Sequence, residues 1–99
     1  MDQSRFEKRK HIRVDAILRA DIFNYSDGKF LGKGVVTDLG VGGMKIETND
    51  VIDEEKDLIV KFFLPNGHYF NDLRCRIVRT QKQSFTFVYG IRFIYIKFR

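Results

Sequence analysis

Apolar and polar side chains alternate along most of this chain, and that alternation constrains its fold more than any other feature. The clearest run has apolar residues at Val14, Ala16, Leu18, Ala20 and Ile22, with charged residues between most of them. A period of two is typical of a β-strand with one buried face. Short strands separated by turn signals predict an antiparallel sandwich or barrel. The six predicted strands cover about 14–22, 30–38, 44–48, 58–64, 69–80 and 85–96.

Turn-forming residues separate these strands. Asp27-Gly28 is a strong hairpin signal, Pro65-Asn66-Gly67 ends the fourth strand, and residues 82–84 connect the fifth to the sixth. Residues 40–43 (Gly-Val-Gly-Gly), here named the glycine corner, follow the second strand, and the acidic segment 49–57 is expected to be a loop or a single helical turn. Closure into a barrel would remove sheet edges that aromatic-rich strands cannot safely expose. In the sixth strand we expect one face to carry Phe85, Phe87, Tyr89, Ile91 and Phe93.

The composition excludes several classes of protein. A hydrophobic content of 43% with ten phenylalanines excludes a disordered chain, and 99 residues fit one domain. Because no apolar run approaches the roughly 18 residues of a spanning helix, we expect no membrane insertion. Cys75 alternates with arginines and is expected in the core of a protein from the reducing cytoplasm. Two histidines and one cysteine make no metal set, and no nucleophile has a histidine–carboxylate pair, so we expect neither cofactor nor enzyme activity.

Positive charge is concentrated at the N-terminus. Residues 1–13, here named the leader, hold five basic and two acidic side chains within a chain of net charge +5. Arg9 and Arg13 would lie about 13 Å apart on one side of an extended leader. Arginine matches phosphate geometry and stacks on bases, while the backbone N–H groups of the glycine corner can bind an anion. We therefore expect a flexible leader (1–13) before a barrel domain (14–99), and a compact anionic ligand; a solvated tail is the alternative interpretation.

These residues also resemble the signatures of a known family. Arg9-x-x-x-Arg13 followed by Asp38-x-Gly40-x-x-Gly43 resembles the RxxxR and (D/N)xSxxG motifs of PilZ domains, bacterial receptors for cyclic di-GMP. The resemblance continues through 58–65, 76–79 and 89–93. It implies a six-stranded antiparallel β-barrel, and because the chain stops at Arg99, we expect the C-terminal helix of many members to be absent or truncated. One departure is that the serine of the family motif is Gly40 here.

The resemblance implies a cyclic di-GMP site formed by Arg9, Arg13, Asp38, Gly40 and Gly43. Both arginines would bind phosphates and guanine, and Asp38 would accept hydrogen bonds from the N1–H and N2–H edge of guanine. Asp38 could instead cap its own turn. Arg92 could reach the ligand or lie along the outer surface, and His11 could stack on a base or be solvated.

Three functions follow from these expectations. The first is a cyclic di-GMP receptor whose leader becomes ordered on the ligand and signals to an unidentified partner protein. The second is a degenerate PilZ-like interaction module without cyclic di-GMP binding, which Gly40 favours. The third is a small barrel for single-stranded nucleic acid, which needs aromatics exposed beside lysines. Most aromatics here share faces with aliphatic residues, so we expect no DNA binding.

Overall fold

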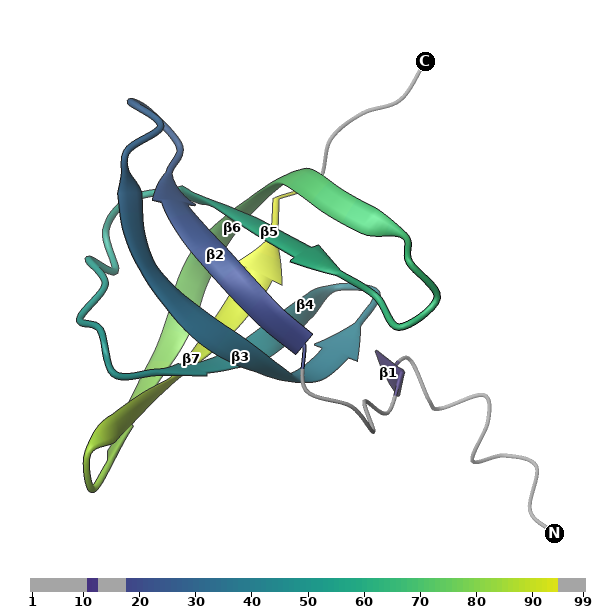
Figure 1. Cartoon of the computed structure of the whole chain (residues 1–99). Helices are drawn as coiled ribbons and strands as arrows, with labels where there is room; N and C mark the ends of the chain where they lie inside the picture. The colour runs from purple at the N-terminus through teal and green to yellow at the C-terminus, as the bar shows by residue number, and fades with distance from the viewer. Residues whose placement is uncertain (1–10, 13–17, 95–99) are drawn as a thin grey trace, which may run out of the picture.

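Every regular element of the computed structural model, which describes residues 11–12 and 18–94, is a β-strand. The expected all-β class is confirmed, and no helix occurs in this described part of the chain. The strands are β1 (His11–Ile12), β2 (Leu18–Asn24), β3 (Phe30–Gly40), β4 (Gly43–Thr48), β5 (Leu58–Phe63), β6 (Tyr69–Gln83) and β7 (Thr86–Phe93) (Figure 1).

Six of the strands close into a barrel. Strand β2 pairs with β3 and β5, β5 pairs with β6, and β6 pairs with β7. Strand β7 then pairs with β4, and β4 pairs with β3, which completes the circle. Every pairing is antiparallel, so the predicted six-stranded antiparallel barrel is confirmed. Closure pairs both sides of the strands in the body of the barrel, which leaves few backbone groups open to another chain.

The predicted alternation fills the barrel with apolar side chains. In β2, Leu18, Ala20 and Ile22 are buried while Arg19 is exposed. Cys75 is buried as predicted, and its burial raises the pKa of its thiol to about 12. The core is completed by Val36, Leu39, Met44, Ile46, Ile52, Leu58, Val60, Phe62, Ile77, Tyr89 and Ile91.

One core residue comes from the acidic segment 49–57, where the sequence pattern predicts only a loop. Ile52 is 3% exposed, and its backbone N–H donates a 2.9 Å hydrogen bond to the hydroxyl of Tyr89. That hydroxyl donates in turn to the carbonyl oxygen of Asp50, at 3.4 Å. The segment is thereby fastened to β7 by one apolar side chain and one buried tyrosine.

Phe85 does not lie where the sequence pattern predicts. Strand β6 continues to Gln83 and β7 begins at Thr86, so Ser84 and Phe85 form the turn between them. Ser84 has a φ of 46°, the left-handed conformation of tight hairpin turns. Phe85 is therefore 90% exposed, and the expectation that it shares the inward face of β7 is wrong.

Two residues of the leader are paired with the barrel. His11 and Ile12 form β1, which pairs with Gly40 and Leu39 of β3. Strand β3 runs four residues beyond Val36, its last partner in β2, so its backbone groups there are open to another strand. Strand β1 takes this edge, and Figure 1 shows it beside the end of β3. The rest of the leader, residues 1–10 and 13, lies outside the described residues.

Candidate ligand-binding site

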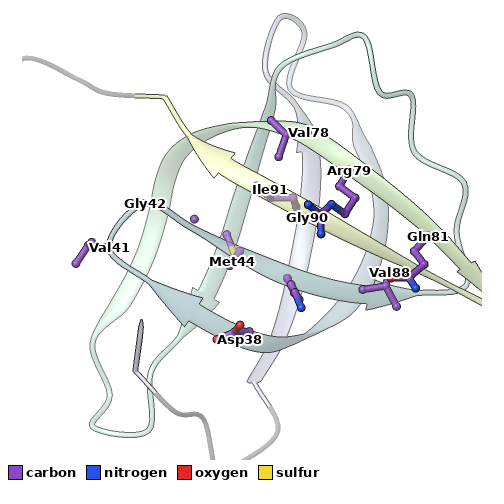
Figure 2. Close-up of a pocket in the computed structure, with 12 residues that line it drawn as sticks. Asp38, Val41, Gly42, Met44, Val78, Arg79, Gln81, Val88, Gly90 and Ile91 are labelled. Atoms are coloured by element: carbon purple, nitrogen blue, oxygen red, sulfur yellow. The ribbon is translucent and has the colours of Figure 1, made fainter. Parts of the chain in front are cut away.

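An open hollow lies on the barrel surface across β3, β4, β7 and β6. Its volume is about 690 Å³, which is within the range of small-molecule sites, roughly 300–1,000 Å³. We name it the β4–β7 hollow. Figure 2 shows the side chains around it. Its lining consists of Asp38, Val41, Gly42, Gly43, Met44, Lys45, Val78, Arg79, Gln81, Val88, Gly90 and Ile91.

A row of four residues crosses the hollow in strand register. Asp38 on β3 is opposite Lys45 on β4, Lys45 is opposite Gly90 on β7, and Gly90 is opposite Arg79 on β6. Cross-strand partners project to the same face of a sheet, and Lys45 and Arg79 are exposed, so this is the outer face. Three strand spacings of about 4.8 Å separate Asp38 from Arg79 by about 14 Å along the sheet.

Two β-bulges lie next to this row. The register shifts between Val36 and Asp38 where β3 meets β4, and again between Ile77 and Arg79 where β6 meets β7. A bulge bends its strand and changes the direction of the following side chains. Val78, at the second bulge, is 57% exposed and lines the hollow, and Arg79 directly after it is exposed as well.

Two glycines allow close packing around the hollow. A Cβ at Gly43 would lie 2.1 Å from the carbonyl oxygen of Ile91, so only glycine lets β4 approach β7 here. A Cβ at Gly90 would lie 3.3 Å from the Cβ of Arg79. Because Gly90 has no side chain, the row has a gap over β7, and the stem of Arg79 borders that gap.

The arginines of β6 differ in their partners. Arg74 and Arg76 both hold Asp57, with nitrogen–oxygen distances of 2.7 and 2.6 Å. Hydrogen bonding from Arg76, and then from Arg74, lowers the pKa of Asp57 below its ordinary value despite some desolvation. Arg79, by contrast, has no acidic partner among the described residues. Its guanidinium is therefore available to a ligand.

The predicted site residues fall into three groups. Asp38 is half-buried and lines the hollow together with Gly43. Gly40 ends β3 beside His11 and is not part of the lining. Arg9 and Arg13 lie outside the described residues. Of the residues left open by the sequence, Arg92 is exposed on β7 and does not line the hollow, and His11 belongs to β1.

Lys45 and Arg79 line the hollow although no sequence pattern indicates either as a site residue. Lys45 lies 34 positions before Arg79 in the chain, and only the register of four strands brings both into one row. Arg79 belongs to the 76–79 run that resembles the family. The register shift between Ile77 and Arg79 leaves both Val78 and Arg79 exposed, although strict alternation would place them on opposite faces.

Residues 11–12 and 18–94 contain no group of three or more His, Cys, Asp or Glu side chains that could hold a metal ion. They also contain no helix long and apolar enough to cross a membrane.

Comparison with known proteins places the chain in a family. No curated protein is similar enough to the chain to be matched with it. The family model described as PilZ domain matches residues 7–98, which is nearly the whole length and includes both motifs. The all-strand barrel agrees with that match. The chain therefore belongs to the PilZ domain family, whose members are binding and adaptor modules for cyclic di-GMP signalling.

Proposed function

We propose that this PilZ domain is a cyclic di-GMP receptor that acts in the bacterial cytoplasm and has no enzyme activity of its own. The observation that carries the proposal is the pairing of β1 with the end of β3. His11 and Ile12 lie beside Gly40 and Leu39, next to the strand residue Asp38 that lines the hollow. In the sequence, Arg13 follows Ile12 directly and Arg9 precedes His11 by two positions. The two residues that pair with the end of β3 therefore lie, in the sequence, between the two arginines of the family signature.

The chemistry of these segments suits a cyclic dinucleotide of guanine. In the proposal Arg9 and Arg13 bind phosphates and guanine through charge-assisted, forked hydrogen bonds. The Asp38 carboxylate accepts from guanine N1–H and N2–H, because an acceptor-only group needs a partner that donates. The backbone of the glycine corner adds N–H donors for phosphate oxygen. Gly43 contributes to the site indirectly, since its missing side chain lets β4 lie against β7.

The proposed signal is a change in the leader. Cyclic di-GMP binding fixes residues 5–13 against the glycine corner, and a partner protein recognises the resulting surface. Amide hydrogen exchange at residues 5–13, with and without ligand, tests this step. Increased protection with ligand is expected. High protection that is unchanged by ligand would refute the switch but not the binding.

Calorimetric titration with cyclic di-GMP tests binding itself, with GTP and cyclic di-AMP as comparison ligands. Arg9→Ala and Arg13→Ala should each weaken binding by roughly 1.5–3 kcal/mol, because each removes a charge-assisted contact. Lysine at either position should restore only part of that loss. The matched control is Arg19→Ala, which removes the same charge from an exposed position on β2. If both leader variants bind like this control, the proposed site is wrong.

Asp38→Ala separates base recognition from a structural role. If Asp38 reads the guanine edge, the ratio of cyclic di-GMP to cyclic di-AMP affinity falls while phosphate attraction persists. An unchanged ratio with a lower unfolding temperature would make Asp38 a turn cap only.

The substitution of the family serine by Gly40 favours a second candidate. Without the serine hydroxyl the domain loses one hydrogen-bond donor to the ligand, worth roughly 0.5–1.5 kcal/mol. A domain that has lost ligand binding would act through protein contacts alone. A parent protein that shows no heat or competition with cyclic di-GMP, while remaining folded, would favour this interaction module.

A further inference from the structure

We propose that Arg79 is a specificity-determining residue that recognises the O6 and N7 edge of a guanine bound in the β4–β7 hollow. This inference rests on the proposed function and adds a contact from outside the two family motifs. In this arrangement Asp38 holds the N1–H and N2–H edge of the base from β3, and Arg79 holds the neighbouring O6 and N7 edge from β6.

The position of Arg79 in the row supports this assignment. Asp38 and Arg79 are the ends of one row, with Lys45 and Gly90 between them. The row spans about 14 Å along the sheet, so a planar base over Gly90 lies between an acceptor and a donor. The missing side chain at Gly90 gives the base room, and no other residue type would leave that gap as open.

The surroundings of the gap favour a base over a phosphate. Val78 and Val88 line the hollow on either side of the row, and both offer apolar surface for the face of a ring. The face of any base can stack on apolar and planar groups. A phosphate instead binds N–H donors and cations and gains nothing from apolar surface. Lys45, in the same row, can neutralise a phosphate attached to this nucleoside.

The chemistry of arginine fits one base. A guanidinium donates two parallel N–H bonds to guanine O6 and N7, which is a common specific contact between proteins and bases. Adenine carries an N6 amino donor where guanine carries O6, so it would oppose one of the two bonds. The guanidinium of Arg79 can bind such a base, because Arg79, unlike Arg74 and Arg76, forms no ion pair with Asp57.

A ligand–variant cycle tests the contact directly. Cyclic di-GMP and its analogue with 7-deazaguanine bases, which lacks N7, are titrated by calorimetry into the parent, Arg79→Ala and Arg19→Ala. Arg19 provides the matched control because it is also an exposed strand arginine and lies on β2, away from the hollow. Thermal unfolding of each variant checks the fold.

Arg79→Ala should weaken cyclic di-GMP binding about tenfold or more, whereas Arg19→Ala should change it by less than about threefold. The penalty for removing N7 should be clearly smaller in Arg79→Ala than in the parent. Arg79→Gln should lower the ratio of cyclic di-GMP to cyclic di-AMP affinity further, since glutamine matches adenine N6 and N7.

Two results would overturn the inference, and they have different consequences for the proposed receptor function. If the parent binds cyclic di-GMP and the penalty for removing N7 is equal in the parent and Arg79→Ala, Arg79 does not read the base while the receptor function stands. If the parent binds no cyclic di-GMP at all, the proposed function fails and this inference fails with it.

Discussion

Gly43 offers the sharpest test of how the fold supports the site, because its neighbour Gly42 provides an internal control. A Cβ at Gly43 would lie 2.1 Å from the carbonyl oxygen of Ile91, and real Cβ contacts are essentially never shorter than 3.0 Å. Gly43→Ala must therefore push β4 and β7 apart by about 0.9 Å at this point. The obstacle is backbone, so no side-chain rotation can relieve it.

The magnitude follows from the kind of overlap. Overpacking of a buried contact costs about 1–3 kcal/mol, and a rigid backbone obstacle belongs at the upper end. The displacement also strains the strand pairing at Gly43 and Arg92 and the neighbouring hydrogen bond from the Phe93 N–H to the Gly42 carbonyl. We expect Gly43→Ala to lower the free energy of unfolding by about 3 kcal/mol. For a small domain this moves the urea midpoint by about 1–3 M.

Gly42→Ala should behave in the opposite way. No atom lies within 4 Å of a Cβ placed at Gly42, and its φ is not positive. Alanine restricts the unfolded chain, so stability should be unchanged or rise by about 0.4–1 kcal/mol.

Urea unfolding followed by far-UV circular dichroism, without ligand, measures both variants. Equal stability of Gly43→Ala and Gly42→Ala would refute the close-approach argument. If Gly43→Ala were stable but unable to bind cyclic di-GMP, Gly43 would instead be required for the ligand itself.

Three further predictions concern other parts of the domain. Gly40→Ser restores the hydroxyl of the family motif, and serine should be tolerated because Gly40 is not among the glycines with positive φ. The variant should bind cyclic di-GMP more tightly by about 0.5–1.5 kcal/mol. A stable variant whose titration shows no gain in affinity would count against the receptor function. Asp57→Asn should cost about 1–2 kcal/mol at neutral pH, since it weakens two partly exposed contacts to Arg74 and Arg76. The folded-state pKa of Asp57 is lowered, so the stability advantage of the parent over Asp57→Asn is present above pH 3.8 and is lost as the pH falls through that lower value. A difference in urea midpoint between the two proteins that is equally large at neutral pH and below that lower value would contradict the assignment. Cys75 should react with a thiol reagent only as fast as the protein unfolds, because the thiol is buried and its pKa is about 12; rapid labelling of the native protein would show that it is accessible.

The fold class and most of the strands follow from the pattern of residues along the chain. Period-two alternation in β2 identifies Leu18, Ala20 and Ile22 as inward residues, and all three are buried. Asp27-Gly28 marks the first hairpin, where Gly28 has a φ of 74°. These properties are local, since they depend on residues two to four positions apart, and a sequence displays such relations directly.

Which distant residues meet depends on how the strands pair in the folded barrel. Two bulges shift the strand registers and thereby bring Arg79 into a row with Asp38, and one residue more or less in either strand would have changed that row. Ile52 is in the core because Tyr89 holds its backbone, a contact across 37 positions that no pattern in the acidic segment indicates. Phe85 is exposed because the turn takes Ser84 and Phe85 rather than residues 82–84. Register and turn position are properties of paired strands, so they are set when the barrel closes and not by either strand alone.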